Sequence, residues 1–206
     1  MSEERAVLDF FAKTENLSLA LSVADQTDSL REQLNTRFWS QLISQLADTL
    51  APHWRISATE DRNAADSLVG FYCTPLNDQP ICLRPMMEQQ NLGKGLQIYL
   101  GLMWSSAPTP EHLALPAVQA LGEVMNAQGL KGNANFLAWQ WTQLYPRRKD
   151  FLLRYNSQPE AVIAEASALM HQLIFSQQTA LTAANVQLAA APRSMTISLD
   201  KLRSKK

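Results

Sequence analysis

The sequence predicts an α+β protein in which helices flank a twisted antiparallel sheet of about five to six strands. Two patterns support this class. Apolar residues recur every three to four positions near both ends of the chain, and they alternate with polar residues in its middle. The expected order is α-β-β-β-β-α-β-β-α after an N-terminal arm. We expect a helical arm over 1–28, a single α+β domain over 29–190, and a basic, mobile tail over 191–206.

The first elements are helical. Residues 3–13 fit a short amphipathic helix, and we expect this arm to dock on the main body. From Ser29 to Leu50 apolar residues recur at helical spacing, and Pro52 follows where a helix cannot continue. This stripe consists of Leu30, Leu34, Phe38, Leu42, Leu46 and Leu50, widened by Trp39 and Ile43.

Four strands are expected next. The segments 54–58 and 68–74 predict two strands, and the turn residues at 76–79 predict a hairpin that returns over 81–87. The alternation from Leu96 to Trp104 is the strongest strand pattern in the chain, and it predicts a central, buried strand.

The rest of the chain predicts a helix, a second hairpin and a long final helix. The helix starts at Thr109-Pro110 or at Pro116 and ends near Gly129. The hairpin pairs a strand over 136–145 with a strand over 151–155 across a charged turn. Ser157 and Glu160 match a capping box, which predicts one helix running from there toward Pro192.

Composition limits the classes of function. The chain has 206 residues, 46% of them hydrophobic, and a formal net charge of -1, so the molecule as a whole is not built to bind a polyanion. The acidic start and the lack of an apolar run of about 20 residues predict a cytoplasmic protein without membrane association. The two cysteines, Cys73 and Cys82, fit a reducing compartment, although a cross-strand bridge between them stays open.

We expect no catalytic residues, metal or cofactor. His53, His112 and His171 show no spacing typical of a metal site or a triad. Gly93-Lys94-Gly95 lacks the upstream glycine of a phosphate-binding loop, and the predicted strands lack the acidic motif of metal-dependent nucleases. A hydrolase with an unfamiliar site is the remaining catalytic alternative.

The candidate binding residues lie in the second hairpin and the tail. Aromatic residues beside cations can stack bases and neutralise phosphates, which suggests single-stranded nucleic acid; alternatively, the tryptophans are core and the basic turn is merely solvated. The alternation in the tail suggests a strand added to a partner's sheet, or else a disordered solubilising end. The candidates are Trp139, Trp141, Tyr145, Arg147, Arg148, Lys149, Arg154, Met195, Ile197 and Leu199.

The segment order from Ser29 to Leu181 resembles that of the small type III secretion chaperones with the Tir-chaperone-like fold. Residues 121–126, leading into the strand at Phe136, and residues 151–155, leading into the final helix, carry the resemblance. It implies a dimer that holds a partner chain along an antiparallel sheet. We therefore expect a noncatalytic, chaperone-like or adaptor module that binds another protein as a homodimer. The alternative is a nucleic-acid-associated accessory protein that uses the basic hairpin and tail.

Overall fold

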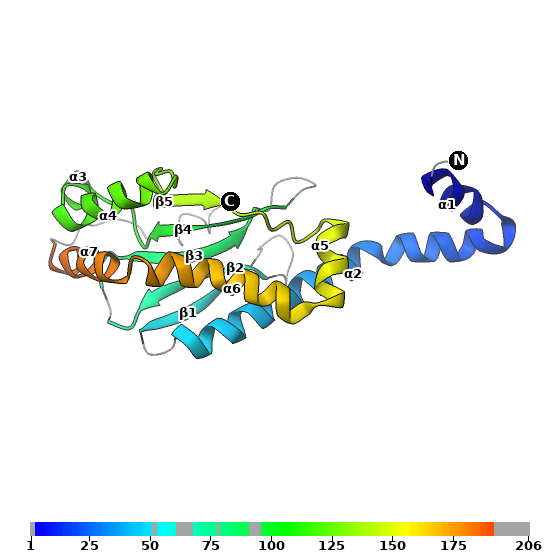
Figure 1. The fold of residues 1–206 in the computed structure, drawn as a ribbon, viewed down its shortest axis with the longest axis horizontal. Helices are drawn as coiled ribbons and strands as arrows, with labels where there is room; N and C mark the ends of the chain where they lie inside the picture. Colours follow the sequence, from blue (N-terminus) through cyan, green and yellow to red (C-terminus); the bar gives the residue numbers. More distant parts are fainter. Residues whose placement is uncertain (1–2, 51–52, 61–67, 78, 91–95, 192–206) are drawn as a thin grey trace.

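The protein folds around one antiparallel sheet whose five strands follow one another in chain order (Figure 1). The computed structural model describes residues 3–50, 53–60, 68–77, 79–90 and 96–191. The predicted α+β class is confirmed. The strands are β1 (Trp54–Glu60), β2 (Leu68–Pro75), β3 (Leu83–Gln89), β4 (Ile98–Trp104) and β5 (Phe136–Trp141). The helices are α1 (Glu3–Phe11), α2 (Thr14–Leu50), α3 (Pro110–Leu113), α4 (Pro116–Ala127), α5 (Lys149–Ser157), α6 (Pro159–Phe175) and α7 (Gln178–Ala190).

The sheet is most regular at its centre. Strands β3 and β4 pair along their full length, from Leu83 opposite Trp104 to Gln89 opposite Ile98. Strands β2 and β3 pair only from Gly70 to Tyr72 on the β2 side. The backbone at the start of β3 therefore lacks a strand partner on its β2 side.

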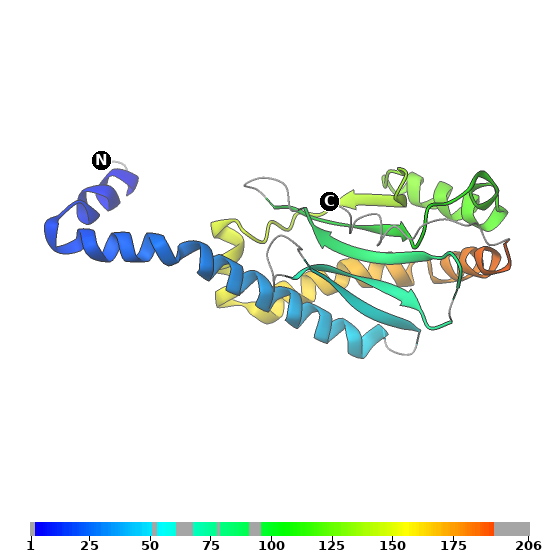
Figure 2. The same cartoon turned by 180° about the vertical axis from the view of Figure 1, so that it is seen from behind.

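Helices α2, α6 and α7 cover one face of the sheet, and the opposite face is turned toward the viewer in Figure 2. The second half of α2 supplies Phe38, Leu42 and Leu46 to the core, each four residues after the last. Full burial of a large apolar side chain contributes about 1.5–3 kcal/mol. This repeated spacing fixes which side of α2 faces the sheet.

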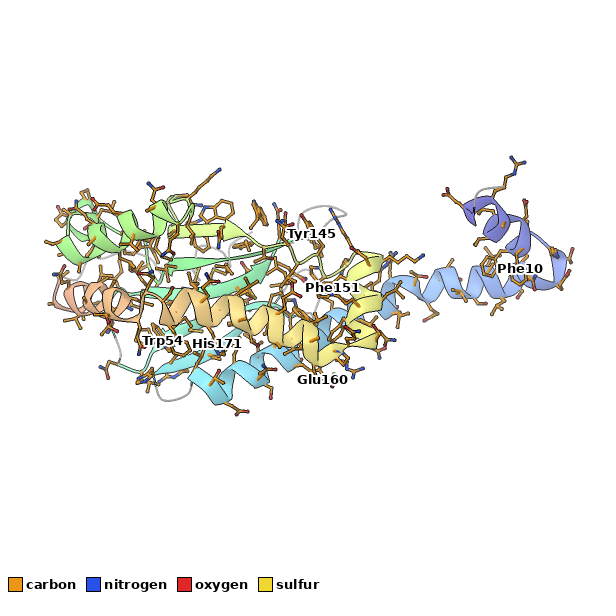
Figure 3. The ribbon with its side chains drawn as sticks, viewed as in Figure 1. Phe10, Trp54, Tyr145, Phe151, Glu160 and His171 are labelled. Carbon is orange, nitrogen blue, oxygen red and sulfur yellow. The ribbon has the colours of Figure 1, made fainter. Side chains whose placement is uncertain are left out.

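The N-terminal arm does not dock on the body, so that prediction is wrong. Helix α2 continues without a break through the expected boundary at 28/29, and its first half projects away from the sheet together with α1 (Figures 1 and 2). Phe10 lies far from Tyr145 and Phe151 in Figure 3. The arm is a helical extension of the domain.

The second hairpin is not formed. Strand β5 ends at Trp141, and the expected returning strand is helix α5. Phe151 and Tyr155, four residues apart, both contact the ring of Phe38, with centroid distances of 5.3 and 5.7 Å. A strand would have placed Leu153 on their side, but Leu153 is 60% exposed. Packing on α2 therefore selects the helical period.

The expected final helix is divided into α6 and α7, and the predicted capping box is wrong. Ser157 is the last residue of α5, and its hydroxyl donates to the Arg154 carbonyl at 3.1 Å. Gln158 leaves helical geometry, and Pro159 opens α6 at a position where no backbone donor is lost. A second interruption at Ser176–Gln177 separates α6 from α7.

Both candidate starts of the middle helix are used. Thr109 caps α3 by accepting from the His112 backbone N–H, and the His112 ring in return accepts from the Thr109 backbone N–H at 3.0 Å. Pro116 opens α4, and Gly129 adopts a φ of +89° just past its end. The predicted boundaries at Pro116 and Gly129 are confirmed.

Candidate functional site

Aromatic side chains gather on the sheet face opposite the helices. Tyr99 on β4 lies at their centre, with its ring centroid 5.5 Å from Trp141, 6.0 Å from Phe136 and 6.1 Å from Trp139. The rings of Trp139 and Trp141 contact each other edge to face at 5.5 Å. These edge-to-face contacts hold the rings in a fixed arrangement. We call Tyr99, Phe136, Trp139 and Trp141 the aromatic cluster.

The sheet geometry below the aromatic cluster requires a glycine. Gly101 is paired with Trp139, and a Cβ atom at Gly101 would lie 2.3 Å from the Ala138 carbonyl oxygen and 2.7 Å from the Trp139 Cβ. Met86 and Met103 fill the space beneath the rings and are almost fully buried. The aromatic cluster is therefore partly exposed, at Trp141, and partly buried in a second, smaller core that contains Phe136.

The basic candidates lie elsewhere, around the start of α5. The Arg148 guanidinium lies over the Tyr145 ring at 3.7 Å, a cation–π contact, and Arg154 forms an ion pair with Glu165 of α6 at 3.0 Å. Arg147 and Lys149 are exposed. We call Arg147, Arg148, Lys149 and Arg154 the basic corner.

The predicted site residues thus form two groups and not one. Trp139 and Trp141 lie on β5, whereas Tyr145 follows the strand and contacts the basic corner. The nucleic-acid alternative requires aromatic and basic residues on a single hairpin, but β5 ends at Trp141 and the basic residues lie at helix α5. The remaining candidates, Met195, Ile197 and Leu199, lie outside the described residues.

The helical arm presents an apolar surface that we did not count among the candidate sites. Eight large apolar side chains in α1 and the first half of α2 are 47–64% exposed, which is far above the usual exposure of such residues in a folded domain. They are Val7, Leu8, Phe10, Leu17, Leu19, Leu21, Val23 and Leu30. In the sequence, residues 3–13 fit an amphipathic helix, whereas Leu17, Leu19, Leu21 and Val23 show a mixed period, and the expectation that the body covers them is wrong.

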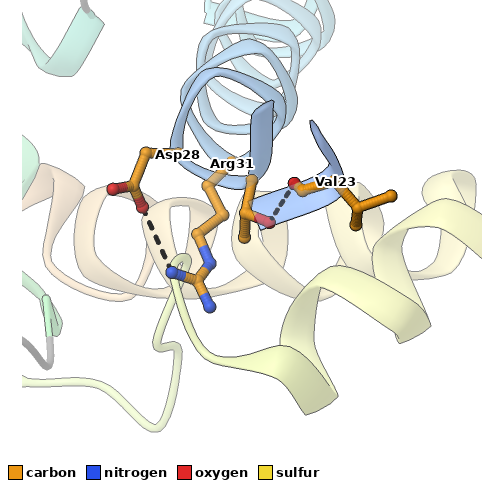
Figure 4. A network of polar contacts seen from close by, with 4 residues as sticks. Val23, Asp28 and Arg31 are labelled. Carbon is orange, nitrogen blue, oxygen red and sulfur yellow. Dashed lines mark hydrogen bonds and ion pairs between the residues drawn. The ribbon is translucent and has the colours of Figure 1, made fainter. Parts of the chain in front are cut away.

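Local contacts on the arm serve its own helix. The Thr27 hydroxyl donates to the Val23 carbonyl at 2.8 Å, and Arg31 pairs with Asp28 at 3.2 Å (Figure 4). Both pairs are exposed and within one turn of α2, so they contribute little to stability. They leave the Val23 side chain pointing away from the helix.

A groove lies where the arm joins the domain. It has a volume of about 370 Å³ and runs between α2 and α5, with an apolar floor and cations at its rim. We call it the α2–α5 groove. Its lining residues are Thr27, Leu30, Arg31, Leu34, Lys149, Leu152, Leu153 and Asn156.

The arm and the basic corner carry opposite charge. Residues 1–28 contain six acidic side chains, Glu3, Glu4, Asp9, Glu15, Asp25 and Asp28, and two basic ones, Arg5 and Lys13. The rim of the α2–α5 groove contains Arg31 and Lys149, and Lys149 belongs to the basic corner. Arg31 already pairs with Asp28, so Lys149 and the rest of the basic corner are the cations that complement the acidic arm.

The histidines have structural neighbours. His112 is buried and belongs to the Thr109 cap, and the His171 ring lies 2.9 Å from the Thr49 hydroxyl between α6 and α2. The described ranges contain no group of three or more histidine, cysteine or acidic side chains placed to hold a metal ion.

A scan of protein-family models and searches of curated proteins and of solved structures gave no match to this chain. The resemblance to the type III secretion chaperones stays a prediction. Among the described helices, none has both the length and the apolar character needed to cross a membrane.

Proposed function

We propose that this chain is a noncatalytic protein-binding module, of adaptor or chaperone-like type, which holds a partner protein along its helical arm and the α2–α5 groove. The observation that carries the proposal is the exposure of eight large apolar side chains on one projecting helical segment. Water-exposed apolar area of this extent is typical of a surface that another protein covers.

The shape of the surface supports a helical mode of binding. The arm is stiff because α2 is a single helix of 37 residues anchored by its buried second half. A preformed helix loses less conformational entropy on binding than a disordered segment would, so more of its contact energy remains as affinity. The groove at the arm's root extends the apolar surface onto the domain.

A cytoplasmic location is part of the proposal. Cys73 and Cys82 are both buried, and the reduced state of cysteines is the one that the cytoplasm maintains. The adaptor would then meet its partner without competition from disulfide exchange.

Site-specific photo-crosslinking in the full chain tests the proposal. A benzophenone amino acid placed at Val23, on the exposed stripe of α2, is expected to form a covalent adduct with a protein in the native cell. The same probe at Asp48, which is exposed on the half of α2 that packs on the sheet and lies outside the arm and the groove, is the matched control. If Val23 gives no more adduct than Asp48, the chain does not bind a protein through this surface and the proposal is wrong.

A further inference from the structure

The exposed stripe of α2 leads directly into the α2–α5 groove. Leu19, Val23, Leu30 and Leu34 are separated by four, seven and four residues, so they share one side of the helix. Leu30 and Leu34 also line the groove. The stripe and the groove therefore lie along one side of α2, half on the arm and half on the domain, with Gln26 and Thr27 between Val23 and Leu30.

This surface is complementary to itself under a two-fold rotation. When two copies of α2 lie antiparallel and cross between Gln26 and Thr27, Val23 of each copy faces Leu30 of the other, and Leu19 faces Leu34. The rotation places the arm of each copy over the groove of the other. Such a contact is isologous and closes at two copies, which prevents further growth.

Charge also favours a second copy as the occupant. An antiparallel arrangement places Glu15 about 6 Å along the helix beyond Leu34 of the other copy's groove, whose rim includes Arg31 and Lys149. Asp25 and Glu32 lie on the side of α2 away from the stripe, so their charges stay in water. Opposite charges at the rim set the orientation of the two helices.

We infer that this surface is a homodimer interface in which each copy lays its arm, antiparallel, into the α2–α5 groove of the other. This inference rests on the proposed function and names the partner at the same surface. It assigns Leu19, Val23, Leu30 and Leu34 as the dimer core, with Val23 and Leu30 adjacent across the two-fold axis.

Cysteine cross-linking tests the geometry. Both native cysteines are buried, so engineered thiols on the arm can be oxidised selectively. Mixing full-length Val23→Cys with full-length Leu30→Cys is expected to give a disulfide-linked dimer, whereas each variant alone gives much less. In the antiparallel arrangement like positions lie about 10 Å apart along the helix, beyond the reach of a disulfide. Asp25→Cys mixed with Leu30→Cys is the control for random collision.

Light scattering of the purified chain supplies an independent readout. A dimer is expected. Val23→Asp is expected to raise the dissociation constant of this dimer more than about tenfold, because each dimer would bury two unpaired carboxylates. Val23 is exposed in the single chain, so this variant keeps its fold, which circular dichroism checks. Lys149→Glu is expected to weaken the dimer less and to reduce its sensitivity to salt.

The outcomes separate the two proposals. A strict monomer, or cross-linking in which Val23→Cys alone equals the mixture, overturns the antiparallel homodimer. If the photo-crosslinked adduct at Val23 then has the mass of this chain plus a different protein, protein binding at the arm stands and only the self-association fails. An adduct with the mass of two copies supports both.

Discussion

The side-chain amide of Asn185 on α7 forms two hydrogen bonds with the backbone of Leu83 on β3. Its Oδ1 accepts from the Leu83 N–H at 2.7 Å, and its Nδ2 donates to the Leu83 carbonyl at 3.1 Å. This is the point at which β2 no longer pairs with β3. The amide of Asn185 thus takes the place of the missing strand partner and joins α7 to the sheet.

The first prediction is that Asn185→Ala destabilises the fold by about 2–4 kcal/mol, because both polar groups of Leu83 would stay buried without partners. Urea unfolding followed by circular dichroism measures the change. Thr182→Ala, at an exposed position one turn earlier on α7, is the control and is expected to change stability by less than about 0.5 kcal/mol. Equal effects of the two variants would show that the amide does not support β3.

The same substitution at Asn35 has the opposite expected sign. Asn35 is buried in α2, and neither its side-chain nitrogen nor its oxygen has a hydrogen-bond partner in the described part of the chain. Asn35→Ala removes two unsatisfied polar groups and adds a better helix former, so we expect a stabilisation of about 1 kcal/mol. A loss of stability in urea would show that Asn35 has a partner in solution.

The third prediction concerns the close approach of β4 and β5. Gly101→Ala would place its Cβ 2.3 Å from the Ala138 carbonyl oxygen, so the strands must move apart. We expect a destabilisation of about 1–3 kcal/mol and a change in tryptophan fluorescence, since Trp139 moves with β5. Gly122→Ala in α4 meets only Leu137 at 3.4 Å, and we expect it to be neutral or slightly stabilising. Unchanged stability and fluorescence in Gly101→Ala would contradict the pairing.

The fourth prediction is a pH dependence that originates at Cys73. Burial raises the pKa of this thiol from 9.0 to about 12. As the pH rises through this interval, the unfolded chain loses the proton and the folded chain keeps it. The contribution of this thiol to the free energy of unfolding is fully present below pH 9 and decreases toward pH 12 by about 1.4 kcal/mol per pH unit. The difference in unfolding free energy between the wild type and Cys73→Ala, measured in urea between pH 8 and about pH 11, is expected to change with this slope. Parallel curves would exclude Cys73 as the source.

The fifth prediction compares two positions on the same helix. Phe38→Ala is expected to destabilise the domain by about 3–5 kcal/mol, because its ring packs against Trp39, Phe151 and Tyr155. Val23→Ala, on the arm, is expected to leave urea unfolding of the dilute protein unchanged within about 0.5 kcal/mol. A large effect at Val23 in dilute solution would mean that the arm is covered within a single chain.

The sequence predicted the sheet better than the helices that follow it. Alternation from Ile98 to Trp104 reports burial on a pleated strand, and this signal is local, so β4 was predicted nearly to its ends. The segment from Phe151 to Tyr155 is too short for its period to be decisive. Its helical state is set by contacts with Phe38, more than a hundred residues earlier in the chain. Tertiary packing of this kind is invisible to local spacing.

The candidate site was predicted only in part. Trp139 and Trp141 do share one surface, because alternate residues of a strand point the same way. Their separation from Arg147 and Lys149 depends on the chain leaving the sheet after Trp141, which the residues 142–148 do not signal. The sequence shows that the arm contains apolar residues, but it does not show that they are exposed. Their exposure depends on the direction in which α2 leaves the domain.

Helix α2 runs without a break from Thr14 to Leu50, so the arm and the main core helix of the domain are parts of one continuous helix. A molecule that binds the first half of α2 also restrains its second half in the core, so binding and unfolding are thermodynamically linked. For self-association this means a melting temperature that climbs as the protein is concentrated. In the cell, the dimer would then resist proteolysis better than the monomer, because the monomer unfolds more often.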